Sequence, residues 1–276
     1  MKKIVCILML CAAVAACNGY EDAVPESCLV LEGWIDSGGY PVVLLSESIP
    51  VRIGDISEED LVESIARWGK VTVSDGYEEV TLTGMMDERY TPPYVFTTSR
   101  MKGVPGRTYT VTADYKDFHA TGTTVIPEPV PLDTIYARRL DDSLFCITCG
   151  FTDPPQKGDF YTFFTKTKGV DRKYQYSYLA HLSDEVLDGY SEIQLVGAVR
   201  FGLKAFSFNF KEGDEVSVKF CTCSRQTYLF WENFDVMQLN NAFVMYEFES
   251  DMSGGLEGAV GYWAGYGASY YDIKIF

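Results

Sequence analysis

The sequence predicts an all-β protein, with an N-terminal immunoglobulin-like β-sandwich and a C-terminal β-rich sandwich or barrel domain that carries one helix. From Ser27 onward, short runs rich in Val, Thr, Tyr and Phe alternate with clusters of Gly, Pro, Asp and Ser, which is typical of many short strands joined by turns. The 276 residues include 19 Tyr, 17 Phe and 24 Gly, and 22% of them are charged. This composition is that of a folded, aromatic-rich chain rather than a disordered one.

The predicted sandwich covers residues 27–126 and begins with a hairpin. Cys28–Ile35 and Val42–Leu45 are apolar runs separated by a turn-forming stretch at residues 36–41. Further strands are expected at residues 71–74, 79–83, 94–98, 108–114 and 119–125. About seven strands over roughly 100 residues match an immunoglobulin-like domain.

One short helix interrupts the predicted sandwich. Ser57 is a suitable N-cap, and apolar residues follow it at intervals of three and four. The residues on this predicted helical face are Leu61, Val62, Ile65 and Trp68.

Three prolines between residues 127 and 132 predict an extended linker, and we place a domain boundary there. The C-terminal domain then covers residues 133–276. Its strands are expected at residues 144–151, 160–166, 174–182, 193–198, 206–210 and 215–221. Helical spacing of aromatic residues predicts a helix over residues 224–238, and residues 254–267 form a glycine-spaced aromatic strand.

The first 16 residues resemble a secretory signal peptide. A positive start, Met1-Lys2-Lys3, precedes an uncharged run that is too short to span a bilayer, which takes about 20 residues. The run ends in Val14-Ala15-Ala16-Cys17, which resembles a bacterial lipobox and predicts cleavage before Cys17 with lipid attached to its thiol. The alternative is an ordinary secretory signal with an incidental Cys.

Residues 17–26 are expected to be a lipidated tether. The acidic pair Glu21-Asp22 resembles the export tag of lipoproteins on the outer face of the outer membrane. A formal charge of −16 disfavours nucleic acids and anionic membrane surfaces. Attachment would therefore depend on acyl chains, at roughly 0.8 kcal/mol per buried CH₂. We expect outer-membrane lipid to be the partner of Cys17, with the protein facing the cell exterior.

Several segments, in order and spacing, resemble one protein family. Besides the lipobox, they are residues 29–35, 71–76, 105–109, 151–154, 213–216 and 254–256. The family is domain-of-unknown-function 4249, which consists of uncharacterised bacterial cell-surface lipoproteins. Asp251-Met252-Ser253 departs from the family's usual Asn-Ile at that place. The resemblance implies a gene setting beside TonB-dependent outer-membrane transporters, and hence such a transporter as a partner, but it supplies no catalytic residues.

Cysteines are the first candidate metal ligands. Cys146 and Cys149 form a C-x-x-C pattern that Cys221 and Cys223 would complete as a zinc site. In a strand, however, Cys146 and Cys149 would lie about 10 Å apart on opposite faces. We therefore interpret these residues as small buried apolar side chains, and we expect no metal or cofactor. Disulfide pairing among the four and Cys28 stays open, including one cross-strand bridge.

Aromatic side chains are the candidate ligand contacts. Tyr174, Tyr176 and Tyr178 alternate on one predicted strand. A second aromatic group comprises Tyr262, Trp263, Tyr266, Tyr270 and Tyr271, of which Trp263 and Tyr266 are the candidate contacts. Flat aromatic faces suit a sugar ring or another planar small molecule. The alternative is that these residues are packing residues of the sandwich.

Acidic side chains raise the question of calcium. Glu247, Glu249 and Asp251 share one strand face, and Asp153 and Asp159 bracket a turn. The sequence has no D-x-D-x-D-G run, so a solvated acidic surface is the favoured interpretation.

Motifs of nucleophilic or metal-assisted hydrolysis are missing, and the chain has only 2 His, so we do not expect an enzyme. The sequence thus predicts a non-catalytic outer-membrane lipoprotein that assists a TonB-dependent transporter by capturing a ligand or by docking. The alternatives are a structural or adhesive, fimbria-like surface component and a hydrolase with a dispersed site. A hydrolase would need a deep cleft with converging carboxylates.

Overall fold

A computed structural model describes residues 27–49, 57–187, 189–198, 207–208, 210–243 and 254–276. Strands dominate the described residues, which confirms the predicted all-β, sandwich-like class. Cys17, the signal segment 1–16 and the tether lie outside the described residues, as do Glu247, Glu249 and Asp251.

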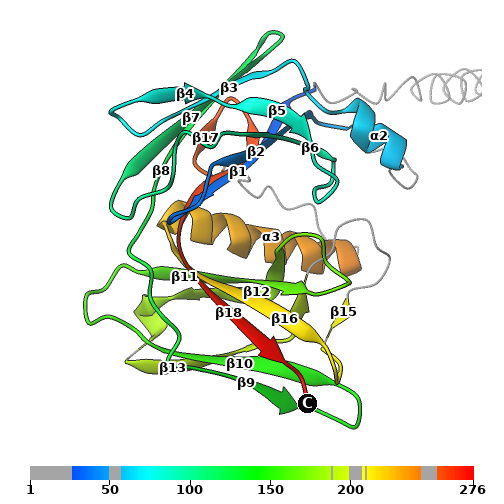
Figure 1. Ribbon diagram of the computed structural model, residues 1–276, viewed down its shortest axis with the longest axis vertical. Helices are drawn as coiled ribbons and strands as arrows, with labels where there is room; N and C mark the ends of the chain where they lie inside the picture. Colours follow the sequence, from blue (N-terminus) through cyan, green and yellow to red (C-terminus); the bar gives the residue numbers. More distant parts are fainter. Residues whose placement is uncertain (1–26, 50–56, 188, 199–206, 209, 244–253) are drawn as a thin grey trace, which may run out of the picture.

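A ten-stranded sheet runs through both halves of the molecule (Figure 1). Its spatial order is β15 (Ser207–Phe208), β14 (Gly197–Ala198), β12 (Gln175–Ser183), β11 (Phe160–Thr167), β16 (Glu215–Cys223), β18 (Val260–Lys274), β1 (Leu29–Asp36), β2 (Val42–Glu47), β6 (Tyr94–Thr97) and β5 (Thr83–Met86).

Two smaller sheets accompany the large one. The first, in the N-terminal half, comprises β17 (Leu256–Glu257), β8 (Phe118–Val125), β7 (Thr108–Tyr115), β3 (Lys70–Ser74) and β4 (Glu79–Thr81). The second, in the C-terminal half, comprises β13 (Tyr190–Leu195), β10 (Phe145–Thr152) and β9 (Thr134–Arg139). The helical elements are α2 (Glu58–Glu63), the 3₁₀ helix η1 (Asp184–Val186) and α3 (Arg225–Phe243).

Strand β18 joins the two halves. Its first part pairs in parallel with β1, from Val260 to Tyr266, and its second part pairs antiparallel with β16, from Gly267 to Lys274. β17 pairs with β8, so the chain after residue 254 completes the N-terminal sheets. The predicted boundary at residues 127–132 stays a prediction, but strand pairing in the described residues crosses it.

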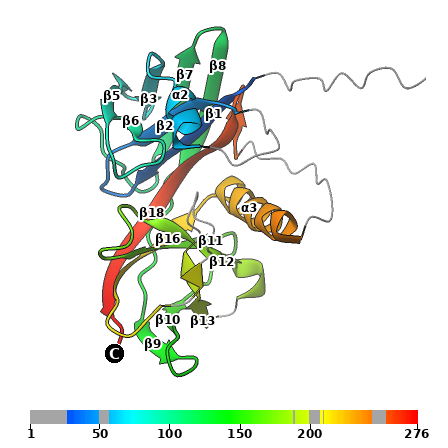
Figure 2. The same cartoon turned by 90° about the vertical axis from the view of Figure 1, so that its right-hand side faces the viewer.

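Three apolar cores follow from this arrangement. The N-terminal core includes Leu31, Val111 and Trp263, and the core of the C-terminal half includes Phe163 and Phe220. A third core lies between α3 and the ten-stranded sheet, and Trp231 of α3 is part of it. In Figure 2, α3 lies on one side of the strands β11, β12 and β16.

The short helix begins as predicted but ends early. Ser57 and Asp60 form a capping box at the start of α2. The helix stops at Glu63 because Ile65 forms an isolated β-bridge with Ser46, which takes the backbone to the sheet edge. The predicted four-residue apolar face is therefore wrong: the side chain of Trp68 is 91% exposed.

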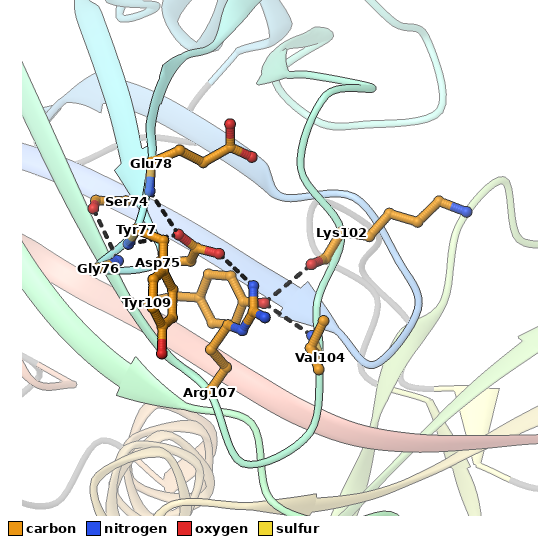
Figure 3. Close-up of polar contacts among 9 residues, drawn as sticks. All are labelled: Ser74, Asp75, Gly76, Tyr77, Glu78, Lys102, Val104, Arg107 and Tyr109. Atoms are coloured by element: carbon orange, nitrogen blue, oxygen red, sulfur yellow. Dashed lines mark hydrogen bonds and ion pairs between the residues drawn. The ribbon is translucent and has the colours of Figure 1, made fainter.

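Two segments that carry the family resemblance meet at an ion pair (Figure 3). Arg107 Nη1 donates to Asp75 Oδ2 at 2.5 Å. Asp75 Oδ1 accepts the backbone N–H groups of Tyr77 and Glu78, both at 3.0 Å. Hydrogen bonds from these two N–H groups and from Arg107 hold the pKa of Asp75 below its usual value, although burial opposes the shift. This pair stabilises the turn between β3 and β4.

Tyr109 fixes the neighbouring turn (Figure 3). Its hydroxyl donates to the carbonyl of Lys102 at 3.0 Å and accepts the N–H of Val104 at 2.9 Å. This arrangement resembles the tyrosine corner of immunoglobulin-like sandwiches. The motif at residues 105–109 thus has a structural role.

Candidate functional site

A pocket of about 510 Å³ opens on the face of the ten-stranded sheet that α3 covers. Its walls come from β1, β11, β12, β16, β18, helix α3 and the loop that carries Tyr90. Pockets of roughly 300–1,000 Å³ are the usual size for small-molecule ligands.

Aromatic side chains dominate the lining. Those that contribute are Trp34, Tyr40, Tyr90, Phe164, Tyr174, Tyr176, Phe230, Trp231, Phe234, Tyr262, Tyr266 and Tyr270. They gather here because neighbouring strands present alternate residues to one face of the sheet. β18 thus directs Tyr262 and Tyr266 toward the same side as Trp34 of β1.

The aromatic rings at the floor of the pocket are held in place by stacking and by hydrogen bonds. Tyr176 stacks on Trp231 with centroids 4.2 Å apart and planes 10° from parallel. The Tyr176 hydroxyl donates to Asp235 Oδ2 at 2.6 Å, and Trp231 Nε1 donates to the Tyr266 hydroxyl at 3.0 Å. Burial, and then the Asp235 carboxylate, raise the pKa of Tyr176. These rings therefore form a rigid, uncharged surface.

Other rings near the opening are only partly covered. Trp34 and Tyr90 pack with centroids 6.1 Å apart, and Tyr174 and Tyr270 with centroids 5.9 Å apart. Tyr270 is half exposed, and Trp34, Tyr90 and Tyr174 are partly buried. Lys173 and Arg89 also lie over the Tyr90 ring, at 5.1 and 5.9 Å from its centroid. The exposed ring surface for stacking on a sugar or planar ring therefore comes from Trp34, Tyr174 and Tyr270.

A buried ion pair lies in the pocket wall. Lys219 Nζ donates to Asp36 Oδ1 at 2.6 Å, and the Tyr270 hydroxyl donates to Asp36 Oδ2 at 2.7 Å. Lys219 Nζ also lies 4.6 Å from the centroid of the Tyr266 ring. Burial lowers the pKa of Lys219, but the Asp36 carboxylate more than offsets this, so the net shift is upward. Lys219 is therefore held in its charged form.

A second pair of opposite charges is less well compensated. Burial raises the pKa of Glu32, although Lys173 opposes the shift. Burial also lowers the pKa of Lys173, with Glu32 opposing. Both shifts favour the neutral forms, so this part of the pocket is poorly solvated.

The pocket is positive in an otherwise acidic chain. Among the described residues, five basic side chains line it, against the two carboxylates of Glu32 and Asp36, whereas the chain carries a net charge of −16. The basic residues are Arg89, Lys166, Arg172, Lys173 and Lys219. Outside the lining, Asp87 pairs with Arg89 at 2.6 Å. When Lys219 is set against Asp36 and Lys173 against Glu32, the excess positive charge comes from Lys166 and Arg172. This excess attracts anions by electrostatic focusing.

The structure brings together three of the five ligand contacts suggested by the sequence. Tyr174, Tyr176 and Tyr266 line the pocket, whereas Tyr178 packs partly buried beside the α3 core without lining it. Trp263 lies on the opposite face of β18, buried in the N-terminal core, where its Nε1 donates to the carbonyl of Tyr109 at 3.0 Å. The grouping of Trp263 with Tyr266 ignored the two-residue period of a strand.

Sequence reasoning missed Trp34, Tyr90 and Trp231 as pocket residues. The available signal was the pattern Glu32, Trp34, Asp36, which places charged and aromatic residues on one face of β1.

The cysteines occupy separate cores. All five described cysteines are free thiols, so the cross-strand bridge left open by the sequence is not formed among them. Cys149 packs in the core of the C-terminal half, and Cys221 and Cys223 pack under α3. Burial raises the pKa of Cys149 to about 12. These thiols are small apolar packing groups.

Neither histidine lines the pocket. His181 Nδ1 lies 3.0 Å from both Asp235 Oδ2 and the Tyr176 hydroxyl, and His119 pairs with Asp114 on the surface.

Comparison with known proteins adds one finding. A family described as domain of unknown function DUF4249 matches residues 19–271. No curated protein matches the chain. Within the described residues, helices fall short of the length and apolar character needed to cross a membrane.

Proposed function

This chain belongs to the DUF4249 family, and from that premise we propose that it is a non-catalytic lipoprotein of the outer-membrane surface that captures a ligand for a TonB-dependent transporter. The observation that carries the ligand-binding part is the pocket of about 510 Å³, with its aromatic lining and its excess of positive charge. The lipobox at Cys17 and the gene setting implied by the family resemblance support the surface location and the transporter partner.

The lining defines the class of ligand. Partly covered rings such as Trp34 and Tyr174 suit a flat or ring-shaped molecule, because stacking needs only an accessible aromatic face. Lys166 and Arg172 add positive charge. We therefore propose a small molecule or glycan that combines a ring with a carboxylate or another acidic group.

Glu32 favours one other function, a hydrolase, because it is an acidic side chain in the pocket with a raised pKa. Glycosidases place two carboxyl groups about 5–10 Å apart. Glu32 and Asp36 are four residues apart on β1, or about 13 Å, and Asp36 is already bonded to Lys219 and Tyr270. This spacing supports ligand capture over hydrolysis.

Isothermal titration calorimetry tests the ligand class. Oligosaccharides of glucuronic acid are compared with the corresponding glucose oligosaccharides, and the acidic series is expected to bind more tightly. Trp34→Ala and Tyr174→Ala should weaken binding by about 2–10-fold each, as expected for the loss of one stacking contact. Tyr77→Ala is the matched control, because Tyr77 is an exposed Tyr outside the pocket.

Equal binding of the acidic and neutral oligosaccharides, or equal weakening by Tyr77→Ala, would contradict the proposal. Conversion of a bound oligosaccharide that Glu32→Gln abolishes would favour the hydrolase.

Cell fractionation and affinity purification test the location and the partner. The full chain should sediment with outer membranes, be removed by protease from intact cells and co-purify with a TonB-dependent barrel in mild detergent. Cys17→Ala should leave the membrane fraction. A Cys17→Ala variant that still sediments would refute lipid anchoring, and recovery of no barrel would refute the transporter association.

A further inference from the structure

Three carboxylates converge at one end of the C-terminal half, outside the pocket. Asp153 follows β10, Asp159 precedes β11, and Asp184 begins η1 after β12. One carboxylate oxygen of each residue lies within 4.8 Å of the others. The sequence had suggested only the Asp153 and Asp159 pair, because the pairing of β11 with β12 is what brings Asp184 beside it.

Asp184 carries an observation that is independent of this grouping. The residue is fully buried. Its Oδ2 accepts the backbone N–H groups of Gly158 at 2.6 Å and Asp159 at 3.0 Å. Its Oδ1 is also buried but has no hydrogen-bond partner among the described residues. Leaving a buried charged acceptor without a partner lowers the stability of the folded state by about 1–3 kcal/mol or more. A cation or a donor at Asp184 Oδ1 would remove this cost.

The charges of the cluster do not balance. Asp153 Oδ1 accepts the Tyr161 hydroxyl at 2.6 Å, and its Oδ2 lies 3.6 Å from Lys157 Nζ. Lys157 is the one cation that the described contacts place here, and it also donates to the carbonyls of Asp184 and Leu187 at 2.8 and 2.7 Å. Three carboxylates against one ammonium leave an excess of two negative charges. Burial and the two neighbouring carboxylates raise the pKa of Asp159, as expected for uncompensated like charges.

We propose that Asp153, Asp159 and Asp184 form a binding site for a calcium ion, with Asp184 Oδ1 as its buried ligand. A divalent cation neutralises the excess charge and supplies the missing partner of Asp184 Oδ1. The donors are all carboxylate oxygens, which hard cations prefer, whereas zinc and copper favour nitrogen and sulfur. Calcium suits the cluster because it accepts irregular oxygen geometry and completes its coordination with water or carbonyl oxygens.

The ion would link the loop between β10 and β11 to η1. Bound calcium therefore stabilises the C-terminal half, because an ion that binds only the folded state raises the free energy of unfolding. This role is independent of ligand capture in the pocket.

Calcium titration of the full chain, first stripped with EDTA, tests the site. Calorimetry should show binding of one calcium ion, and added Ca²⁺ should raise Tm. Asp159→Asn should weaken binding at least tenfold, since even outer-shell changes cost roughly 10–100-fold in metal affinity. This variant retains the fold better than Asp184→Asn, because the Asp184 carboxylate also accepts two backbone N–H groups. Asp117→Asn, which removes an exposed carboxylate in the turn between β7 and β8, is the control and should bind as the parent does.

Terbium luminescence gives a second readout. Tb³⁺ replaces Ca²⁺ at oxygen sites and emits when a nearby tyrosine is excited, and the Tyr161 hydroxyl bonds directly to Asp153. Emission that Ca²⁺ displaces in the parent and in Asp117→Asn, but that is weak in Asp159→Asn, supports the site. No calcium-dependent change in Tm together with no displaceable emission would overturn it. Equal calcium affinity of Asp159→Asn and the parent would also overturn it.

Discussion

Replacing Lys219 by Met tests the buried ion pair in the pocket wall. The side chain of Lys219 is 6% exposed and that of Asp36 is 14% exposed, so both charges are removed from bulk water. Methionine retains the length of the aliphatic stem but removes the ammonium. Of the hydrogen bonds to the Asp36 carboxylate from described residues, the one from Tyr270 then remains.

The expected cost is about 3 kcal/mol of unfolding free energy. Removing one partner of a buried pair typically costs about 3–5 kcal/mol, because it leaves an uncompensated charge. We expect the lower end, since Tyr270 still donates to Asp36 and Asp36 has some access to water. For a chain of this size about 1 kcal/mol shifts Tm by roughly 2–4 °C, so Tm should fall by about 6–12 °C.

Thermal unfolding of three variants isolates the pair. Adding Asp36→Asn to Lys219→Met should recover part of the lost unfolding free energy, because this substitution removes the buried, uncompensated carboxylate. Lys168→Met is the control, since Lys168 and Glu215 form a pair exposed to water and should contribute little. If Lys219→Met melts like the parent, or if the double variant is no more stable than Lys219→Met, Lys219 does not stabilise the fold by compensating the buried Asp36 charge.

The pH dependence provides a second check with a definite sign. The pKa of Lys219 is raised in the folded state. The contribution of Lys219 to the free energy of unfolding is therefore fully present below the pKa of about 10.4 that lysine has in the unfolded chain, and it is lost as pH rises through the pKa of Lys219 in the folded state. The difference in Tm between parent and Lys219→Met should be constant from pH 7 to 9 and should narrow above pH 10.4. A difference that widens there would contradict the assignment.

Three further predictions concern the rest of the fold. Asp75→Asn should lower the free energy of unfolding by about 1–3 kcal/mol, because the hydrogen bonds to Arg107 and to the turn are weakened or lost. Because the pKa of Asp75 is lowered in the folded state, the extra stability of the parent should disappear as pH falls below about 3.9, and thermal unfolding from pH 6 to 3 measures this loss. Among the described cysteines only Cys28, which is partly exposed, should react with a maleimide at pH 7.5 before unfolding, as peptide mass spectrometry would show; labelling of a buried thiol in the folded chain would contradict the burial of Cys146, Cys149, Cys221 and Cys223. Residues 27–126 expressed alone should not unfold cooperatively, because they lack β18 and Trp263; a sharp melting transition of this fragment would refute a shared core.

Local patterns in the sequence predicted most of the strands. The run 29–35 alternates in burial, as a half-buried strand should, and Ser57 caps a helix through its own side chain. Strand β9 was missed because its end, Arg138-Arg139, is charged and exposed at a sheet edge. β18 extends to Lys274 rather than residue 267, because pairing with β16 continues the extended backbone. The alternation of residues 270–274, with Tyr271 and Ile273 packed on the core of the C-terminal half, was a signal that the prediction did not use.

Long-range pairing explains what the sequence could not predict about the pocket. The residues of the lining are spread from Val30 to Tyr270, and no local spacing connects them. Tyr174 and Tyr176 were identifiable because they are two residues apart in the sequence, and they stand on either side of the first residue of β12. Trp231 became a pocket residue only when α3 packed over β12, where it meets Tyr176.

The location of the pocket depends on how the N-terminal core is packed. Trp263 fills that core, and Gly33 leaves the space for it, because a Cβ at residue 33 would lie 2.8 Å from Trp263 Cε3. The adjacent residue Tyr262, together with Tyr266, faces the other way and lines the pocket. Strands β1 and β18 therefore each contribute one face to the core and the opposite face to the pocket. A substitution that shifts β18 to accommodate a changed core must displace the pocket rings with it, so core packing and ligand affinity are coupled across the predicted boundary at residues 127–132.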